Sequence, residues 1–166
     1  MPIELMMPLS MTMGFVAFTL IARWYVMPRL NGMSRAQALK PLLLLHSFRY
    51  IGLAFLIPGV TASALDPRFA EPAAYGDLAA AVLALVAILA LHRGWSVAIP
   101  LVWLFSVAGA LDLVNAVAKG LLFTQEGEMG ATYFIPAMIV PALLVSHAMV
   151  FRLLVRNGRK IRRTDA

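Results

Sequence analysis

Long apolar stretches separated by short polar segments run along the whole chain. A transmembrane helix needs about 20 mainly apolar residues to cross about 30 Å of hydrocarbon. Five stretches meet or nearly meet this requirement: residues 5–26, 42–63, 75–95, 97–123 and 132–155. We therefore predict an all-α fold, a polytopic integral membrane protein built as a bundle of five transmembrane helices. Residues 1–166 form a single domain in this prediction, and residues 156–166 form its basic tail.

The stretch 75–95 is the weakest of the five, because its fully apolar part, residues 78–91, is short. Tyr75 and Trp95 flank it where aromatic residues anchor helices at membrane interfaces. Small residues allow helices to approach closely in lipid, so we expect its alanine-rich interior to pack in the middle of the bundle. These alanines are Ala79, Ala80, Ala81, Ala84, Ala87 and Ala90.

Charged residues divide between the two sides that five spans create. Lys and Arg gather in the segment 27–40, in the turn at His92 and Arg93, and in the tail 156–166. Most acidic residues fall on the opposite side: Glu4, Asp66, Glu71, Asp77, Glu126 and Glu128. Basic residues accumulate on the cytoplasmic side of membrane proteins, which predicts an N-out/C-in, multi-pass protein of the cell inner membrane.

Composition supports a membrane location and excludes several kinds of chemistry. The chain is 61% hydrophobic and 13% charged, against about 45–50% and 25% in soluble domains. Its net charge of +6 is explained by the sidedness of the basic residues, so we expect a lipid bilayer and no nucleic acid as partner. The strongly apolar surfaces also suit a homo-oligomer or a larger membrane complex. Cysteine is absent, which excludes disulfides, thiolate metal sites and a cysteine nucleophile.

Asp112 and Asn115 form the first polar group within a span. They lie three residues apart on one face of the fourth helix, near its middle. A carboxylate in hydrocarbon is costly and must be protonated, paired or hydrated. One interpretation is a proton-coupled or ligand-binding site, and the other is an interhelical hydrogen bond that fixes packing.

His46, Arg49 and Tyr50 form the second polar group, on one face of the second helix. A span that starts at residue 42 places them about 6–12 Å inside the cytoplasmic boundary. Arg49 is then within reach of Asp112 if the helices are neighbours, whereas the alternative is contact with phospholipid headgroups. We predict that Asp112, Asn115, His46, Arg49 and Tyr50 bind a ligand.

His147 on the fifth helix is expected at a depth similar to that of His46. Two facing imidazoles can ligate the iron of haem b, so His46 and His147 form a second, weaker hypothesis. The alternative is that both histidines are packing residues. The sequence contains no phosphate-binding loop, metalloprotease or serine-hydrolase motif, and it leaves open whether the protein is an enzyme.

Prolines interrupt two of the predicted helices. Pro58 lies near the outer end of the second helix, and Pro136 and Pro141 lie in the outer half of the fifth. Each removes a backbone donor and frees a carbonyl, so one interpretation is a polar cavity in the outer half of the bundle. The other is that the kinks only shape the bundle.

These features lead to three functional hypotheses. The preferred one is that the protein binds or carries a small lipophilic or anionic molecule through an intramembrane polar site. The second is a non-catalytic accessory or assembly subunit of a larger membrane complex. The third is a membrane redox protein that binds haem or a quinone.

Overall fold

The computed structural model describes residues 5–125 and 127–155, so the predicted tail 156–166 lies outside the described residues. Within the described part, five helical spans are long and apolar enough to cross a membrane, which indicates a multi-pass membrane protein in contact with lipid. The elements of the first two spans are α1 (Met6–Ile21), η2 (Ala22–Val26), α2 (Met27–Asn31), α3 (Arg35–Ser47) and η3 (Phe48–Leu56). Those of the other three are α4 (Pro67–Arg93), α5 (Ala98–Phe123), η4 (Gly130–Tyr133), η5 (Ile135–Ile139) and α6 (Val140–Val155).

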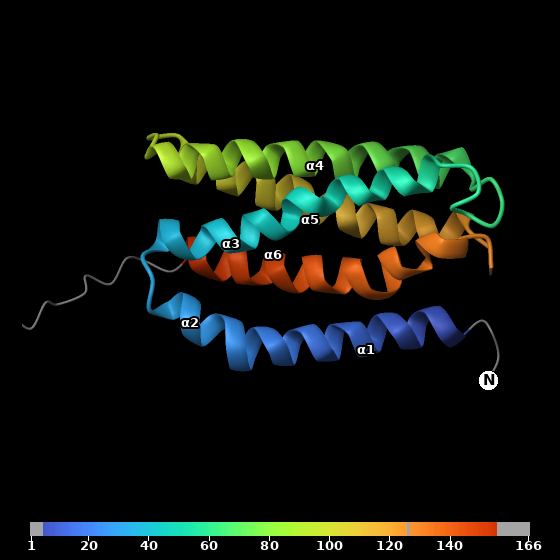
Figure 1. Ribbon diagram of the computed structural model, residues 1–166, viewed down its shortest axis with the longest axis horizontal. Coiled ribbons are helices and arrows are strands. Elements are labelled where there is room, and N and C mark those ends of the chain that lie inside the picture. Colours follow the sequence, from blue (N-terminus) through green and yellow to red (C-terminus); the bar gives the residue numbers. More distant parts are fainter. Residues whose placement is uncertain (1–4, 126, 156–166) are drawn as a thin grey trace, which may run out of the picture.

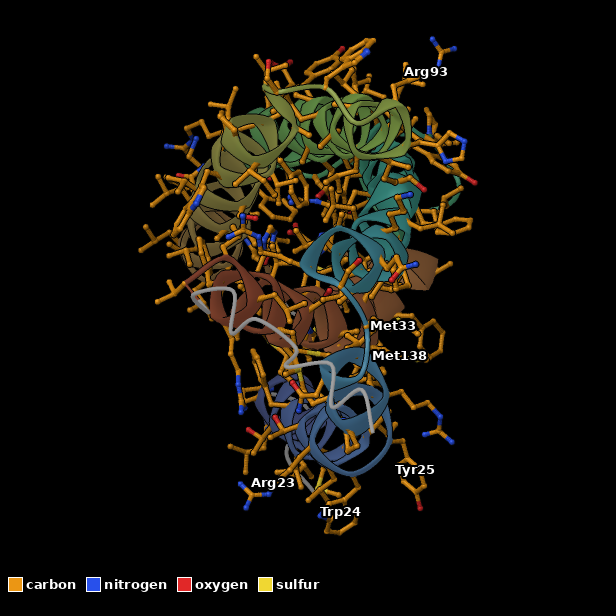
Figure 2. All side chains as sticks on the ribbon, turned by 90° about the vertical axis from the view of Figure 1, so that its left-hand side faces the viewer. Arg23, Trp24, Tyr25, Met33, Arg93 and Met138 are labelled. Atoms are coloured by element: carbon orange, nitrogen blue, oxygen red, sulfur yellow. The ribbon has the colours of Figure 1, made fainter. Side chains whose placement is uncertain are left out.

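The second to fifth spans enclose the interior, and the first span lies outside them (Figures 1 and 2). Helix α4 packs against α5, α3 and η3, while α1 packs against α6 and η5. Figure 2 shows Arg23, Trp24 and Tyr25 projecting away from the bundle on the outer side of the first span. We call the end that contains residues 57–66, 124–125 and 127–134 the loop end, at the right in Figure 1, and the opposite end the turn end.

Alanines form much of the contact surface of α4. Five of the six alanines predicted to pack are buried: Ala80, Ala81, Ala84, Ala87 and Ala90. Ala79 is exposed instead. The buried alanines bring α4 close to its neighbours along its length, as small residues do between helices in lipid. Close packing by these alanines is therefore confirmed, but α4 lies at one side of the bundle, against α3, η3 and α5, and not in its middle (Figure 1).

The second span begins earlier and ends earlier than the predicted range 42–63. Ser34 caps α3 in a capping box. Its side chain accepts a hydrogen bond from the backbone N–H of Gln37, and the Gln37 side chain accepts one from the backbone N–H of Ser34. This cap starts the helix at Arg35, and Pro41 lies inside it rather than opening it. The span ends at Leu56, and Pro58 lies beyond it. His46 and Arg49 therefore lie in the middle of the span and not near its turn end.

The third span also begins before its predicted start at residue 75. Asp66 caps α4 by accepting from the backbone N–H of Arg68, and Pro67 occupies the first turn. The Arg68 guanidinium, hydrogen-bonded to the carboxylate, lowers the pKa of Asp66 to about 2, so this cap stays ionised at neutral pH. The earlier start places Asp77 deeper in the span than predicted, about 15 Å from the helix start at 1.5 Å per residue.

Prolines coincide with widened helical turns. The π-helical segments η2 and η5 come just before Pro28 and Pro141. Proline cannot donate to the carbonyl four residues earlier, so the helix widens locally over that turn. Segment η3 is different, because it keeps tighter 3₁₀ geometry for nine residues, which is longer than the usual three or four.

Candidate functional site

Arg49 occupies the centre of the bundle and binds acceptors on two other helices. Its Nε donates to Asp77 Oδ1 of α4 at 2.7 Å, and its Nη2 donates to Asp112 Oδ2 of α5 at 2.5 Å. Its Nη1 donates to the carbonyl oxygen of Gly109 at 3.0 Å. The Arg49 side chain is fully buried, whereas those of Asp77 and Asp112 keep 12% and 19% exposure. We call Arg49, Asp77 and Asp112 the charged triad.

The 3₁₀ geometry of η3 explains how Arg49 is aimed. A 3₁₀ helix has three residues per turn, so residues three apart lie above one another. The buried residues of η3 are Arg49, Gly52 and Phe55, which form one such row. This row faces α4, against which η3 packs. The local backbone therefore turns the guanidinium toward Asp77 and places Phe55 further toward the loop end.

Glycines make space for the triad on each of three helices. A Cβ on Gly52 would overlap the Asp77 carboxylate, and a Cβ on Gly76 would overlap the Asp112 carboxylate. A Cβ on Gly109 would lie 2.9 Å from Arg49 Nη1 and 3.1 Å from the His147 ring. Each charged side chain thus lies against a neighbouring helix at a position without a side chain, which lets the helices approach closely around it.

Two histidines lie beside the triad, further toward the turn end. The His46 and His147 rings are 4.2 Å apart between centroids. His46 Nε2 is 3.2 Å from Ser146 Oγ, and Phe105 stacks on His147 at 5.2 Å. Both histidines are almost fully buried. This cluster extends the polar interior from α5 and α4 to α3 and α6.

The histidine pair does not fit the predicted haem. Two imidazoles that ligate one iron from opposite faces have ring centroids about 6 Å apart, given metal–nitrogen distances of about 2 Å. Here the rings touch, and Phe105 packs against both. A porphyrin plane therefore has no room between them. The described residues also contain no group of three or more His, Cys, Asp or Glu that could hold a metal ion.

A cavity of about 730 Å³ lies on the loop-end side of the triad. Helix α1 forms one wall and α5 the opposite wall, with Phe55, Phe69 and the η4–η5 segment between them. The α1 residues that line it are Met6, Met7, Pro8, Met11, Thr12 and Phe15. Tyr133 lines it too and ties α1 to η4, because its hydroxyl lies 2.7 Å from Ser10 Oγ. The walls are mainly apolar.

Asp77 connects this cavity to the triad. It is the only ionisable residue among the described lining residues apart from Tyr133, and it belongs to both the cavity wall and the ion pair with Arg49. Asp77 lies at mid-depth in α4, whereas other lining residues, Thr124, Gln125 and Gly127, belong to the loop end. The cavity therefore leads from the loop end to a buried carboxylate.

The structure brings together only part of the predicted site. Arg49, Asp112, His46 and His147 lie in one interior cluster, and the proposed contact between Arg49 and Asp112 is present. Tyr50 and Asn115 are exposed on the outside of the bundle instead. Tyr50 points outward because the three-residue period of η3 buries Arg49 but rotates the next residue away. Asn115 lies outside the inward-facing row of α5 that contains Gly109 and Leu113.

Asp77 is the main functional residue that the sequence prediction missed. The predicted span 75–95 contains Asp77 only as the third residue from its outer end, because Tyr75 is expected at the membrane interface. Asp66 followed by Pro67 is a helix start signal. A helix that begins at this signal is longer than predicted and contains Asp77 well inside its ends. The three-residue spacing of Arg49, Gly52 and Phe55 is a further signal in the sequence, because it marks the row of η3 that faces the interior.

The chain belongs to a family that is described as a domain of unknown function, DUF8737, whose model matches residues 6–155. No curated protein and no solved structure matches the chain significantly. The matched range contains all five spans, the triad and the cavity.

Proposed function

We propose that this member of the DUF8737 family binds a small lipophilic molecule in the cavity between α1 and α5, with one polar group of the ligand at Asp77. The observation that carries the proposal is the cavity itself, about 730 Å³ of mainly apolar space that ends at a buried carboxylate. Pockets that hold small molecules measure about 300–1,000 Å³ and combine apolar walls with a few polar groups. This cavity has both properties.

The arrangement of the helices supports entry of a ligand from the lipid. Helix α1 contacts the rest of the bundle through α6 and η5, and the cavity occupies the space between α1 and α5. The outer face of α1 is exposed and apolar, as a lipid-facing surface is. We further propose that the loop end faces the outside of an inner membrane, because basic residues such as Arg29 and Arg93 lie at the turn end.

The balance of charge favours a neutral or positively charged ligand over an anionic one. The triad contains two carboxylates and one guanidinium, and no Lys or Arg is among the described residues that line the cavity. An anion in this cavity would approach Asp77 without a free cationic partner. Transport by this site, an accessory role in a larger complex and binding of a quinone stay predictions, and a quinone would be one neutral lipophilic ligand for the same cavity.

Photochemical cross-linking tests the proposal. The probe is a neutral long-chain alcohol that carries a diazirine, added to the purified protein in nanodiscs of neutral phospholipid. We expect saturable labelling of cavity residues such as Met7, Met11 and Val117, located by peptide mass spectrometry. Excess unlabelled alcohol should suppress this labelling, because both compounds compete for the same cavity.

Two variants on the same helix provide the control. Ala116 lines the cavity, and Ala118 is exposed on another face of α5. Ala116→Phe fills part of the cavity and should abolish the saturable labelling, whereas Ala118→Phe adds the same ring on the exposed face and should preserve it. Equal labelling of the two variants, or labelling spread evenly over lipid-facing residues, would refute the proposal.

A further inference from the structure

We propose that the ligand is a lipophilic cation, and that the charged triad releases one proton when this cation binds beside Asp77. This inference rests on the proposed function and adds the chemical class of the ligand and its exchange partner. It depends on the charge of the triad, on the side chains that line the cavity, and on the position of Asp77 between the two.

The triad has one negative charge more than positive charge when all three groups are ionised. Among the described residues, Arg49 is the cation that bonds to it, and this one guanidinium is shared between Asp77 and Asp112. An unbalanced charge buried in low-dielectric surroundings is costly, because water no longer solvates it. Either a proton on one carboxyl group or a nearby cation can balance it.

The cavity can hold a cation that balances this charge, at the position beside Asp77. Asp77 is the only acidic residue in the described lining, and its side chain keeps 12% exposure. Four aromatic residues also line the cavity: Phe15, Phe55, Phe69 and Tyr133. Aromatic rings attract cations through their negative faces, and the effect is strongest away from water. A bulky apolar cation therefore finds apolar contact, aromatic faces and a carboxylate in the same cavity.

The exchange balances charge without a covalent step. In the empty protein, one carboxyl group of the triad holds a proton, so the triad is neutral. When the cation enters, that O–H bond breaks, the proton passes to water, and the carboxylate forms an ion pair with the ligand. One proton leaves for each monovalent cation that binds, and the total charge of the interior stays the same.

The other titratable groups near the triad do not replace it as the exchanging group. His46 of α3 and His147 of α6 lie on the far side of the guanidinium from the cavity lining, and neither lines the cavity. Tyr133 of η4 lines the cavity, but its hydroxyl lies 2.7 Å from Ser10 Oγ of α1. The α1 residues in the lining carry no charge. Asp77 is thus the acidic group that a ligand reaches first.

Binding of tetraphenylphosphonium and of tetraphenylborate tests the inference, because these ions have similar size and opposite charge. Both are measured by equilibrium dialysis against the purified protein in nanodiscs of neutral phospholipid. We expect the phosphonium to bind at least about tenfold more tightly than the borate and to displace the neutral photoreactive alcohol. Its affinity should rise with pH, and a dye in weak buffer should report about one released proton per bound cation.

Variants on α4 separate the triad from general effects of charge. Asp77→Asn should lower phosphonium affinity at least about tenfold and remove the proton release, while the neutral alcohol still binds. Glu71→Gln removes an exposed carboxylate from the same helix and should change neither the phosphonium affinity nor the proton release. If Asp77→Asn fails to fold, the proton release of the unaltered protein still decides the question, because it requires no variant.

The outcomes distinguish the two proposals. Equal affinity for both ions, or phosphonium binding without proton release, overturns the cation-exchange inference while retained binding of the neutral alcohol supports the cavity. Failure of all three probes to bind overturns the proposed function as well. Tight phosphonium binding with one released proton, both lost in Asp77→Asn, supports both proposals together.

Discussion

Replacing Arg49 by methionine is expected to cost about 3–5 kcal/mol of unfolding free energy, since removing one partner of a buried ion pair leaves an uncompensated charge. Here the loss leaves the carboxyl groups of Asp77 and Asp112, and the negative charge they carry, without the guanidinium that bonds to both. Methionine preserves much of the length and volume of the side chain, so loss of packing contributes little. Equilibrium unfolding in mixed micelles with increasing SDS, followed by tryptophan fluorescence, measures the change.

Two further variants identify the cause of that loss. Adding Asp77→Asn and Asp112→Asn to Arg49→Met removes the unpaired charges and should recover at least about half of the lost free energy. Arg68→Met breaks an exposed Arg–Asp pair at the start of α4 and should leave stability nearly unchanged. A triple variant less stable than Arg49→Met alone would mean that the residues stabilise the bundle by packing and not by charge compensation.

Gly76→Ala should produce the second large effect, a loss of about 1–3 kcal/mol, as overpacking in a tightly packed interior does. The new methyl group would overlap the Asp112 carboxylate. Asp112 is a short side chain held by Arg49, so it cannot move aside without lengthening its ion pair. The same unfolding measurement applies.

Gly120→Ala on α5 is the matched control. Its new methyl group would lie 3.4 Å from the Phe69 ring, an ordinary van der Waals contact. Alanine is about 1 kcal/mol more favourable than glycine inside a helix, so this variant should be as stable as the original chain or more stable. If Gly76→Ala were also neutral or stabilising, α4 and α5 would have to be further apart at Asp112 than the structure places them.

Hydropathy predicted the number and kind of helices correctly, because the cost of exposing polar backbone in lipid leaves few other choices. It predicted the helix ends less well. Apolar content begins well after Arg35 and Pro67, yet capping by Ser34 and Asp66 starts the helices there. The predicted ranges 42–63 and 75–95 leave out the polar first turns of both helices. They therefore displace His46 and Arg49 toward the turn end and place Asp77 at the outer end of its span.

The candidate site was predictable only in part, because its geometry depends on contacts between distant segments. The contact of Arg49 with Asp112 could be expected from the cost of burying either charge alone. The choice of Arg49 over Tyr50 as the inward residue could not, because α-helical spacing places both on one face. The 3₁₀ geometry of η3 aligns Arg49 with Gly52 and Phe55 in the buried row and leaves Tyr50 outside that row. The touching rings of His46 and His147, which exclude haem, depend on how α3 packs on α6.

The most direct test of the central claim is to locate a bound lipophilic molecule by X-ray diffraction. Crystals grown in a lipidic phase with an iodine-tagged long-chain alcohol would show the iodine through its anomalous scattering. We expect an iodine peak between α1 and α5, beside Phe15 and Val117, with the alcohol directed toward Asp77. Iodine found only on the outer surface of the bundle, with α1 packed directly against α5, would contradict it.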